Sequence, residues 1–489
     1  MAIDEAIDQY FAPVAKAFSD VIFFSVRVGE ADLPLIVLWL VAGAVFFTVY
    51  LRFINLRGFT HALRLVRGDY TDPDDPGEVS HFQALATAIS GTVGVGNIAH
   101  VAVAISVGGP GAAFWMVVAG ILGMASKFAE CTLGVKYRQE NPDGTISGGP
   151  MFFLDRGLTE RGWPRLGRGL AIYYAACILI GTLGIGSMFQ ANQAYVQFQN
   201  AVGGHVSLFA DRGWLFGIGL AVLVAVVIVG GIRSIARVAE KLVPMMALVY
   251  VGAGLFVILA NVTEIPQALV WIVKGAFSPE GATGGMLGVL ILGFRRAAFS
   301  NEAGIGSAAV AHSAVRTREP VTEGYVALLE PFIDTVIVCS ITALVITLTV
   351  YDPATATGEM SGVELTSQAF ATVLPWFPLP LAGVVMLFAY STMIAWSYYG
   401  LEGWIYLFGP APRTKAIYNA IFCASVVVGC TTSLTAILDF SDAMIFAMAL
   451  ANLLGLYLLA PVLRAELESY EARLASGEIR PFRNRGADD

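Results

Sequence analysis

Two stretches of the chain carry the same spaced set of small and polar residues, each inside a long apolar segment. The first holds Ser90, Gly94, Gly96, Asn97 and Ala99, and the second holds Ser300, Gly304, Gly306, Ser307 and Ala309. Glycines at the centre of a membrane-length helix weaken it, and hydrocarbon cannot satisfy the backbone groups that are released. A matching pair of such breaks in two halves of a chain indicates a transporter binding site.

The first break offers groups for a small charged ligand. Unwinding near Gly94 and Gly96 exposes carbonyls for a hard cation and amides for a carboxylate. Asn97 and Thr92 add neutral oxygens, which suit Na⁺. Close helix packing through small residues is the alternative interpretation. The second copy at 300–309 favours binding.

Two arginines, Arg295 and Arg296, precede the second break by one to two turns. Ionisable groups at this depth mark a pathway or a buried pair. We expect either an outer gate or a structural pairing, for example with Glu302 or Glu330.

Other charged residues inside apolar segments have structural explanations. Lys127 and Glu130 are spaced for an ion pair along one helix. Asp334 is a lone acid, for which a hydrogen-bonded structural role is favoured over an ion ligand.

Two further segments place polar groups where a site needs them. Gln190 lies within an apolar stretch and must find a partner there. Thr392 and Trp396 are four residues apart and share a helix face. Hydroxyls beside an indole suit a cation site next to a small-ligand pocket, although such hydroxyls also bond back to their own helix.

Composition identifies an all-α polytopic membrane protein. The chain has 489 residues, of which 56% are hydrophobic and 13% are charged, and its mean hydropathy is +0.70. Soluble domains carry about 25% charged residues. The five cysteines all fall in apolar segments, so neither disulfides nor a thiolate metal site is expected. The chain has no HExxH motif, clustered Cys/His or nucleotide-binding loop, and we expect no enzyme activity.

The pattern predicts about eleven transmembrane helices, two of them discontinuous. They cover 32–51, 82–106, 113–136, 170–198, 213–231, 236–260, 284–311, 323–350, 379–407, 415–436 and 443–463. Five spans separate the starts of the broken ones, which predicts an inverted repeat of five plus five. The predicted parts are an amphipathic segment (1–31), an extra helix (32–51), the two repeats (82–260 and 284–463) and a cytoplasmic tail (464–489).

The basic residues predict the orientation. With the N-terminus outside, most Lys and Arg residues fall in cytoplasmic loops and in the C-terminal tail. Those left outside are Lys16, Arg27, Arg212 and Lys274. Two short apolar stretches, 264–277 and 364–377, are expected to lie at the outer face.

The chain resembles the alanine/glycine:cation symporters, or sodium:alanine symporter family, over about residues 80–460. The resemblance rests on the segments 91–99, 108–111, 123–130, 148–151, 299–307, 332–335 and 391–399. It implies the fold of the neurotransmitter-sodium symporters and the leucine transporter.

The resemblance also implies site residues. Na⁺ is expected at the metal ligands Ser90, Val93, Ser391 and Thr392. The amides of Val95 and Gly96 are expected to receive the substrate carboxylate. The full substrate-binding set is Thr92, Val95, Gly96, Asn97, Phe189, Gln190, Phe299, Ser300, Asn301 and Trp396.

The chain departs from the family at two positions. His100 and Ala297 stand where a glycine is common. His100 is expected to narrow the pocket, to gate it with Arg295 and Arg296, or to add pH sensitivity, with simple packing as the alternative.

The expected function is import of alanine or glycine with Na⁺ by alternating access. The alternatives are coupling to H⁺, through Glu302, Asp334 or His100, and a passive channel. The expected location is a bacterial inner membrane, with the lipid bilayer and the amino-acid substrate as partners. Neither an organic cofactor nor a nucleic-acid partner is expected, and the oligomeric state stays open.

Overall fold

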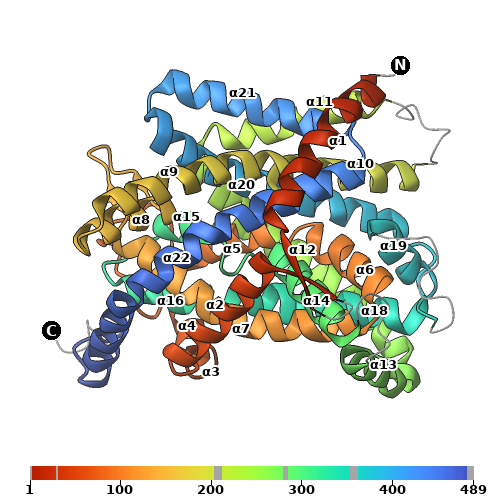
Figure 1. The fold of residues 1–489 in the computed structure, drawn as a ribbon, viewed down its shortest axis with the longest axis horizontal. Helices are drawn as coiled ribbons and strands as arrows, with labels where there is room; N and C mark the ends of the chain where they lie inside the picture. Colours follow the sequence, from red (N-terminus) through yellow and green to blue (C-terminus); the bar gives the residue numbers. More distant parts are fainter. Residues whose placement is uncertain (1–2, 29–30, 203–211, 279–284, 353–361, 482–489) are drawn as a thin grey trace.

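The computed structural model is built almost entirely from helices (Figure 1). It describes residues 3–28, 31–202, 212–278, 285–352 and 362–481. The α-helices are α1 (Ile3–Ile22), α2 (Leu35–Tyr50), α3 (Ile54–Arg57), α4 (Phe59–Val66), α5 (His81–Thr92), α6 (Gly96–Gly108), α7 (Gly111–Lys136), α8 (Pro150–Glu160), α9 (Pro164–Gly181), α10 (Gln190–Ala201), α11 (Gly213–Ile228), α12 (Gly231–Ala260), α13 (Ile265–Phe277), α14 (Gly285–Asn301), α15 (Ala308–Ser313), α16 (Pro320–Ala327), α17 (Leu329–Pro331), α18 (Ser340–Thr349), α19 (Gly362–Ala371), α20 (Pro378–Phe408), α21 (Pro412–Gly429) and α22 (Leu434–Ala475).

The remaining elements are short. Two segments are π-helical, η1 (Thr182–Phe189) and η4 (Phe332–Cys339), and η3 (Val262–Glu264) is a 3₁₀ turn. Two antiparallel hairpins pair β1 (Ser25–Val28) with β2 (Ala31–Pro34) and β3 (Gln139–Glu140) with β4 (Ile146–Ser147). The sequence did not predict these hairpins.

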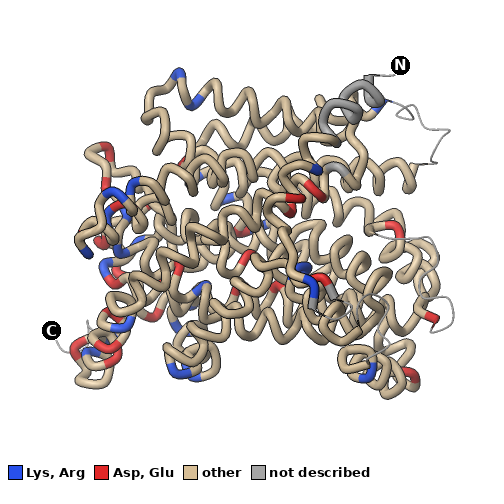
Figure 2. The backbone as a smooth tube through the Cα atoms, viewed as in Figure 1, with Lys and Arg blue, Asp and Glu red and all other residues tan. Residues whose placement is uncertain are grey.

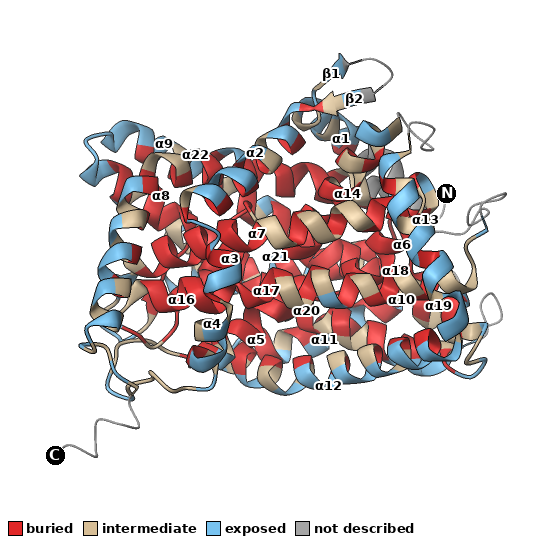
Figure 3. Cartoon of the chain, turned by 90° about the horizontal axis from the view of Figure 1, so that it is seen from below, coloured by how far each residue is buried: buried red, intermediate tan, exposed pale blue. Residues whose placement is uncertain are grey.

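The surface and the helix lengths are those of a multi-pass membrane protein. Within the described ranges, six helices are long and apolar enough to cross a membrane, or up to seven if the bent pair α5–α6 is one span. Large apolar side chains on α11 and α12 are exposed, among them Val226 and Leu248 at 75%. The buried residues gather inside the bundle and the exposed ones at its rim (Figure 3).

Both predicted helix breaks are present. The first separates α5 from α6 at residues 93–95, with a bend of 40°. The second separates α14 from α15 at residues 302–307. There Glu302, Gly304 and Gly306 have φ of 56°, 88° and 93°, a left-handed conformation that glycine adopts without steric cost.

The two short apolar stretches left out of the predicted spans agree in part with the structure. The stretch 264–277 corresponds closely to α13, whereas the stretch 364–377 corresponds to a shorter helix, α19, which ends at Ala371. Pro375 follows, and proline disfavours helical geometry in the residue before it.

The terminal segments pack on the bundle. α1 lies along α22, and Ala15 joins Phe440, Ala443 and Met444 in a small buried cluster. The tail expected from residue 464 begins as the last turns of α22, which continues to Ala475. Charged residues gather at the end of the molecule that holds α8, α16 and the C-terminus (Figure 2).

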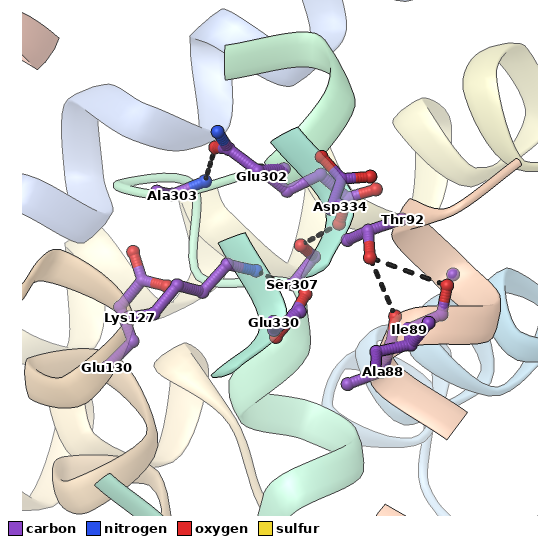
Figure 4. Close-up of polar contacts among 12 residues, drawn as sticks. Ala88, Ile89, Thr92, Lys127, Glu130, Glu302, Ala303, Ser307, Glu330 and Asp334 are labelled. Carbon is purple, nitrogen blue, oxygen red and sulfur yellow. Dashed lines mark hydrogen bonds and ion pairs between the residues drawn. The ribbon is translucent and has the colours of Figure 1, made fainter. Parts of the chain in front are cut away.

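A buried ion pair ties the middle of α7 to α17. Lys127 Nζ lies 2.9 Å from Glu330 Oε1, and both side chains are fully buried (Figure 4). The ion pair predicted between Lys127 and Glu130 is therefore wrong, because Lys127 points across to another helix. Glu130 instead accepts a hydrogen bond from Asn452 Nδ2 at 2.8 Å.

Two lysines on α7 provide a matched test of this buried pair. Lys127→Met leaves the Glu330 carboxylate without its cation, so we expect a loss of about 3–5 kcal/mol in the free energy of unfolding. Lys136→Met removes a partly exposed pair with Glu466 and should cost about 0–1 kcal/mol. Thermal unfolding in detergent measures both. Equal loss of stability in the two variants would contradict a special role for the buried pair.

Candidate functional site

The end of α5 and the middle of α20 exchange hydrogen bonds beside the first break. Ser90 Oγ donates to the Ser391 carbonyl at 2.7 Å, and Thr392 Oγ1 donates to the Ser90 carbonyl at 2.9 Å. Val93 is the C-cap of α5, and a Cβ on Gly94 would lie 2.4 Å from Thr392 Oγ1. The structure thus brings the predicted cation ligands together. Neutral hydroxyl and carbonyl oxygens are a donor set that suits Na⁺.

The amides of the break itself are covered by side chains. Gly94 N–H donates to Asn97 Oδ1 at 3.0 Å, and Val95 N–H donates to Gln190 Oε1 at 3.3 Å. Gln190 follows directly on the π-helical segment η1, which the sequence did not reveal. A carboxylate that took the Val95 amide would have to displace the Gln190 side chain.

Thr92 lies beside this site but bonds to its own helix. Its hydroxyl donates to the Ala88 carbonyl at 3.2 Å, one turn earlier on α5 (Figure 4). Hydroxyls inside helices commonly bond back in this way. Ser391, for which the sequence suggested this alternative, does so as well, with its Oγ donating to the Phe388 carbonyl at 3.0 Å.

A buried carboxylate joins the two breaks. Asn97 Nδ2 donates to Asp334 Oδ1 at 2.5 Å, and Ser300 Oγ donates to Asp334 Oδ2 at 2.8 Å. Thr335 Oγ1 also donates to Asp334 Oδ2, at 2.6 Å, and accepts from Asn301 Nδ2 at 2.9 Å. Asp334 lies on η4, and π-helical turns are frequent at functional sites. The sequence favoured a hydrogen-bonded acid at Asp334, with an ion ligand or a proton carrier as alternatives, and the structure shows the hydrogen bonds.

The indole of Trp396 connects α20 to both breaks. Its Nε1 donates to the Gly91 carbonyl and to Glu302 Oε1, each at 3.2 Å. Ser307 donates to the other oxygen of Glu302. Trp396, which was expected to line the pocket, therefore also links the two breaks through hydrogen bonds.

Three aromatic rings stack next to the first break. His100 lies on Phe299 with ring centroids 3.8 Å apart, and Phe189 meets His100 and Phe299 edge-on at 4.9 and 5.5 Å. A Cβ on Gly96 would lie 3.8 Å from Phe299. Phe299 therefore packs against the first turn of α6, where an added carbon on Gly96 would be in ordinary van der Waals contact with its ring.

The two arginines of α14 pair with Asp442 on α22. Arg295 Nη2 lies 2.7 Å and Arg296 Nη2 3.2 Å from Asp442 Oδ2, and Arg296 Nη1 lies 3.0 Å from His100 Nδ1. The partners suggested from the sequence, Glu302 and Glu330, are therefore wrong. The sequence could not reveal this contact, because Asp442 lies 147 residues after Arg295 in the chain.

The close approach of η1 to α20 gives a testable prediction. A Cβ on Gly186 would lie 2.5 Å from Trp396 Cβ, so Gly186→Ala overpacks the site and should cost about 1–3 kcal/mol. Gly383→Ala, on α20 with no atom within 4 Å, should be neutral or stabilising by up to about 1 kcal/mol. Thermal unfolding of both variants checks this, and an unaffected Gly186→Ala protein would contradict the packing described.

Comparison with known proteins relates this architecture to transporters. The sequence pattern of the sodium:alanine symporter family matches residues 22–484. The chain is 38% identical over 440 residues to the sodium/alanine symporter AgcS of Methanococcus maripaludis, covering 89% of this chain and 94% of that protein. It is 32% identical to the probable sodium/glutamine symporter GlnT of Bacillus subtilis, with 91% and 89% covered.

Solved structures agree in fold. MhsT in complex with L-phenylalanine matches with a TM-score of 0.51 at 15% identity, covering 80% of this chain and 99% of that chain. A manganese transporter of Eremococcus coleocola matches with a TM-score of 0.50 at 15% identity, with 82% of each chain covered. These likenesses show a leucine-transporter-like fold. The family match along nearly the whole sequence, together with the relative that is 38% identical, shows that this chain belongs to the sodium:alanine symporter family of membrane transport proteins.

Proposed function

We propose that this protein imports a small neutral amino acid, alanine or glycine, together with Na⁺. The observation that carries the proposal is the reciprocal bonding of Ser90 with Ser391 and Thr392 at the first break. This bonding brings uncharged hydroxyl and carbonyl oxygens together next to the amides of Val95 and Gly96, which would hold the amino acid. A relative that is 38% identical is named a sodium/alanine symporter, which supports the same substrate and ion.

The cation would be held by Ser90, Val93, Ser391 and Thr392. Two of these hydroxyls now donate to carbonyls across the α5–α20 contact. Turning them toward a Na⁺ would convert the same oxygens into ligands, with no proton released. One net charge that moves inward down about 100 mV supplies roughly 2.3 kcal/mol, or about a fifty-fold accumulation.

The substrate would lie next to the cation, with its carboxylate on the amides of Val95 and Gly96. Gln190 then has to release the Val95 amide, which makes it a positioning residue for the bound state. Asn97, Ser300 and Asn301, with the shared carboxylate network, would hold the ammonium side. Phe189, Phe299 and Trp396 would close the pocket round a small side chain, with Thr92 at its edge.

The proposed transport cycle is alternating access between two repeats. Within the described residues, the eleven stretches predicted to span the membrane are largely helical apart from the two breaks, and the breaks are joined by the bond from Asn97 to Ser300 at 3.2 Å. We propose the five-plus-five inverted repeat, an outer N-terminus and a cytoplasmic C-terminus in a bacterial inner membrane. His100, Arg295 and Arg296 would form the outer gate with Asp442.

Proton coupling is the second candidate. Asp334 is an acid shared by both broken helices, and its protonation would weaken its bonds from Asn97 and Ser300. One relative, 33% identical, is named a putative sodium/proton-dependent alanine carrier of Bacillus subtilis.

Uptake of radiolabelled alanine into proteoliposomes, under an inward Na⁺ gradient, an inward H⁺ gradient or neither, tests the proposal. We expect uptake with Na⁺ alone. Thr392→Ala removes one ligand worth about 1.5–3 kcal/mol, so the half-saturating Na⁺ concentration should rise roughly ten- to a hundredfold. Thr392→Ser keeps the hydroxyl and should transport nearly as the wild type does.

A matched control is Thr347→Ala, which removes a buried hydroxyl that donates to the Ala343 carbonyl within α18. It should leave the Na⁺ dependence unchanged. Uptake driven by H⁺ alone would select the second candidate, and no alanine uptake under any gradient would overturn the substrate.

The size of the pocket gives a separate prediction. His100→Ala removes the ring stacked on Phe299, so larger neutral amino acids should compete with alanine more strongly than they do in the wild type. Competition by valine, leucine and phenylalanine measures the change. An unchanged competition profile would place His100 outside the pocket.

A further inference from the structure

A cluster of four buried titratable residues lies apart from the site described above. We call it the inner histidine cluster, and it consists of His81, His312, Glu323 and Glu330. They lie on α5, α15, α16 and α17 respectively. Their side chains are 3%, 0%, 0% and 0% exposed. Nothing proposed above for the cation or the substrate uses these four residues.

One carboxylate binds both histidines. Glu323 offers one oxygen to His81 Nδ1 and the other to His312 Nδ1. A carboxylate accepts hydrogen bonds only, so each ring carries its proton on Nδ1.

His312 differs because its second nitrogen also faces a carboxylate. His312 Nε2 lies 3.8 Å from Glu330 Oε2, and neither atom has a hydrogen-bond partner within the described part of the chain. With Nδ1 protonated, a neutral ring would direct the lone pair of Nε2 at an anionic oxygen. A ring protonated at both nitrogens directs N–H groups at both carboxylates. The geometry therefore fits an imidazolium.

The charges around the ring lead to the same conclusion. Glu323 and Glu330 carry two negative charges, and Lys127 supplies one positive charge at 2.9 Å from Glu330. A proton on His312 makes this buried group neutral, which low-dielectric surroundings favour. Within the described residues, the other charged or titratable groups that face the cluster are Glu130, Cys131, Arg138, Glu302, Asp334 and Tyr399.

The cluster lies where two broken helices meet at their inner halves. The chain leading into α5 is bonded to the chain leaving α15, since Arg316 N–H donates to the Val79 carbonyl at 2.8 Å. Small residues pack the same seam closely: Ala88, Cys131, Ala308, Ala309 and Ala327. Separation of α5 or α15 from α16 would break a histidine–Glu323 contact.

We propose that His312, between Glu323 and Glu330, is a proton-binding site that is filled while these inner helix halves are together and emptied when they separate. This deepens the proposed function and rests on its alternating access. The proton comes from the cytoplasmic solution, forms the N–H bond at Nε2 and returns to the same solution, so no net proton crosses the membrane. Acid on the cytoplasmic side then favours the closed form, by up to roughly tenfold per pH unit.

The first test is ¹⁵N NMR of the full-length protein in lipid nanodiscs, with its five histidines labelled. At about pH 8 we expect one histidine with both ring nitrogens protonated, and we expect this signal to vanish in His312→Gln. It should persist in the matched control His61→Gln, which removes a histidine that bonds Tyr470 on α22 in the wild type. If His312→Gln does not fold, assignment proceeds by elimination with His61→Gln, His81→Gln, His100→Gln and His205→Gln. Only neutral histidines at this pH would overturn the proposal.

The second test is Na⁺-driven alanine uptake with the pH of the cytoplasmic face varied from about 5.5 to 8.5. The wild type and His61→Gln should slow severalfold as this face is acidified, whereas His312→Gln should show a flat profile. An equally steep profile in His312→Gln would overturn the proposal. An imidazolium seen by NMR in a wild type that takes up no alanine would overturn the proposed function and leave the proton site standing.

Discussion

A helix that ends inside a membrane leaves carbonyl and amide groups without partners, and hydrocarbon supplies none. Both breaks in this protein are built around that constraint. Gln190 and Asn97 satisfy amides of the first break, and Trp396 binds the carbonyl of Gly91. These partners come from α6, α10 and α20, so the breaks exist only because several helices pack around them. A small ligand can compete with these side chains for the backbone amides, and this competition allows the break to serve as a binding site.

Buried charged side chains are likewise paired with groups of opposite charge. Lys127 with Glu330 ties α7 to the helix that follows the second break, and Asp442 holds the two arginines of α14. Each of these pairs joins elements that are distant in sequence. A charge buried without its partner is strongly unfavourable, so these contacts specify which helices can be neighbours. The core of the bundle is thus organised by a few polar connections inside a large apolar interior.

Each end of the proposed pathway holds a histidine in contact with charged residues. On the outer side His100 lies between the aromatic rings and Arg296. On the inner side His312 lies between two glutamates. The two environments differ in sign, because the Arg296 guanidinium contacts the first ring and two carboxylates flank the second. The same residue type therefore has different preferred protonation states at the two ends, which makes only the inner one a site that retains a proton.

The sequence by itself determined the class of the molecule, since hydropathy and small-residue spacing depend on local order along the chain. It placed both helix breaks and the helical stretches, and the resemblance to a known family grouped Ser90 with Ser391 and Thr392. The tertiary structure alone decided which charges pair. Lys127 was assigned to Glu130 and the arginines to Glu302 or Glu330, yet the partners are Glu330 and Asp442. The π-turns that position Gln190 and Asp334 were invisible too, because one extra residue in a turn leaves no mark on composition. Partner choice depends on how helices pack, and packing is a property of the whole chain.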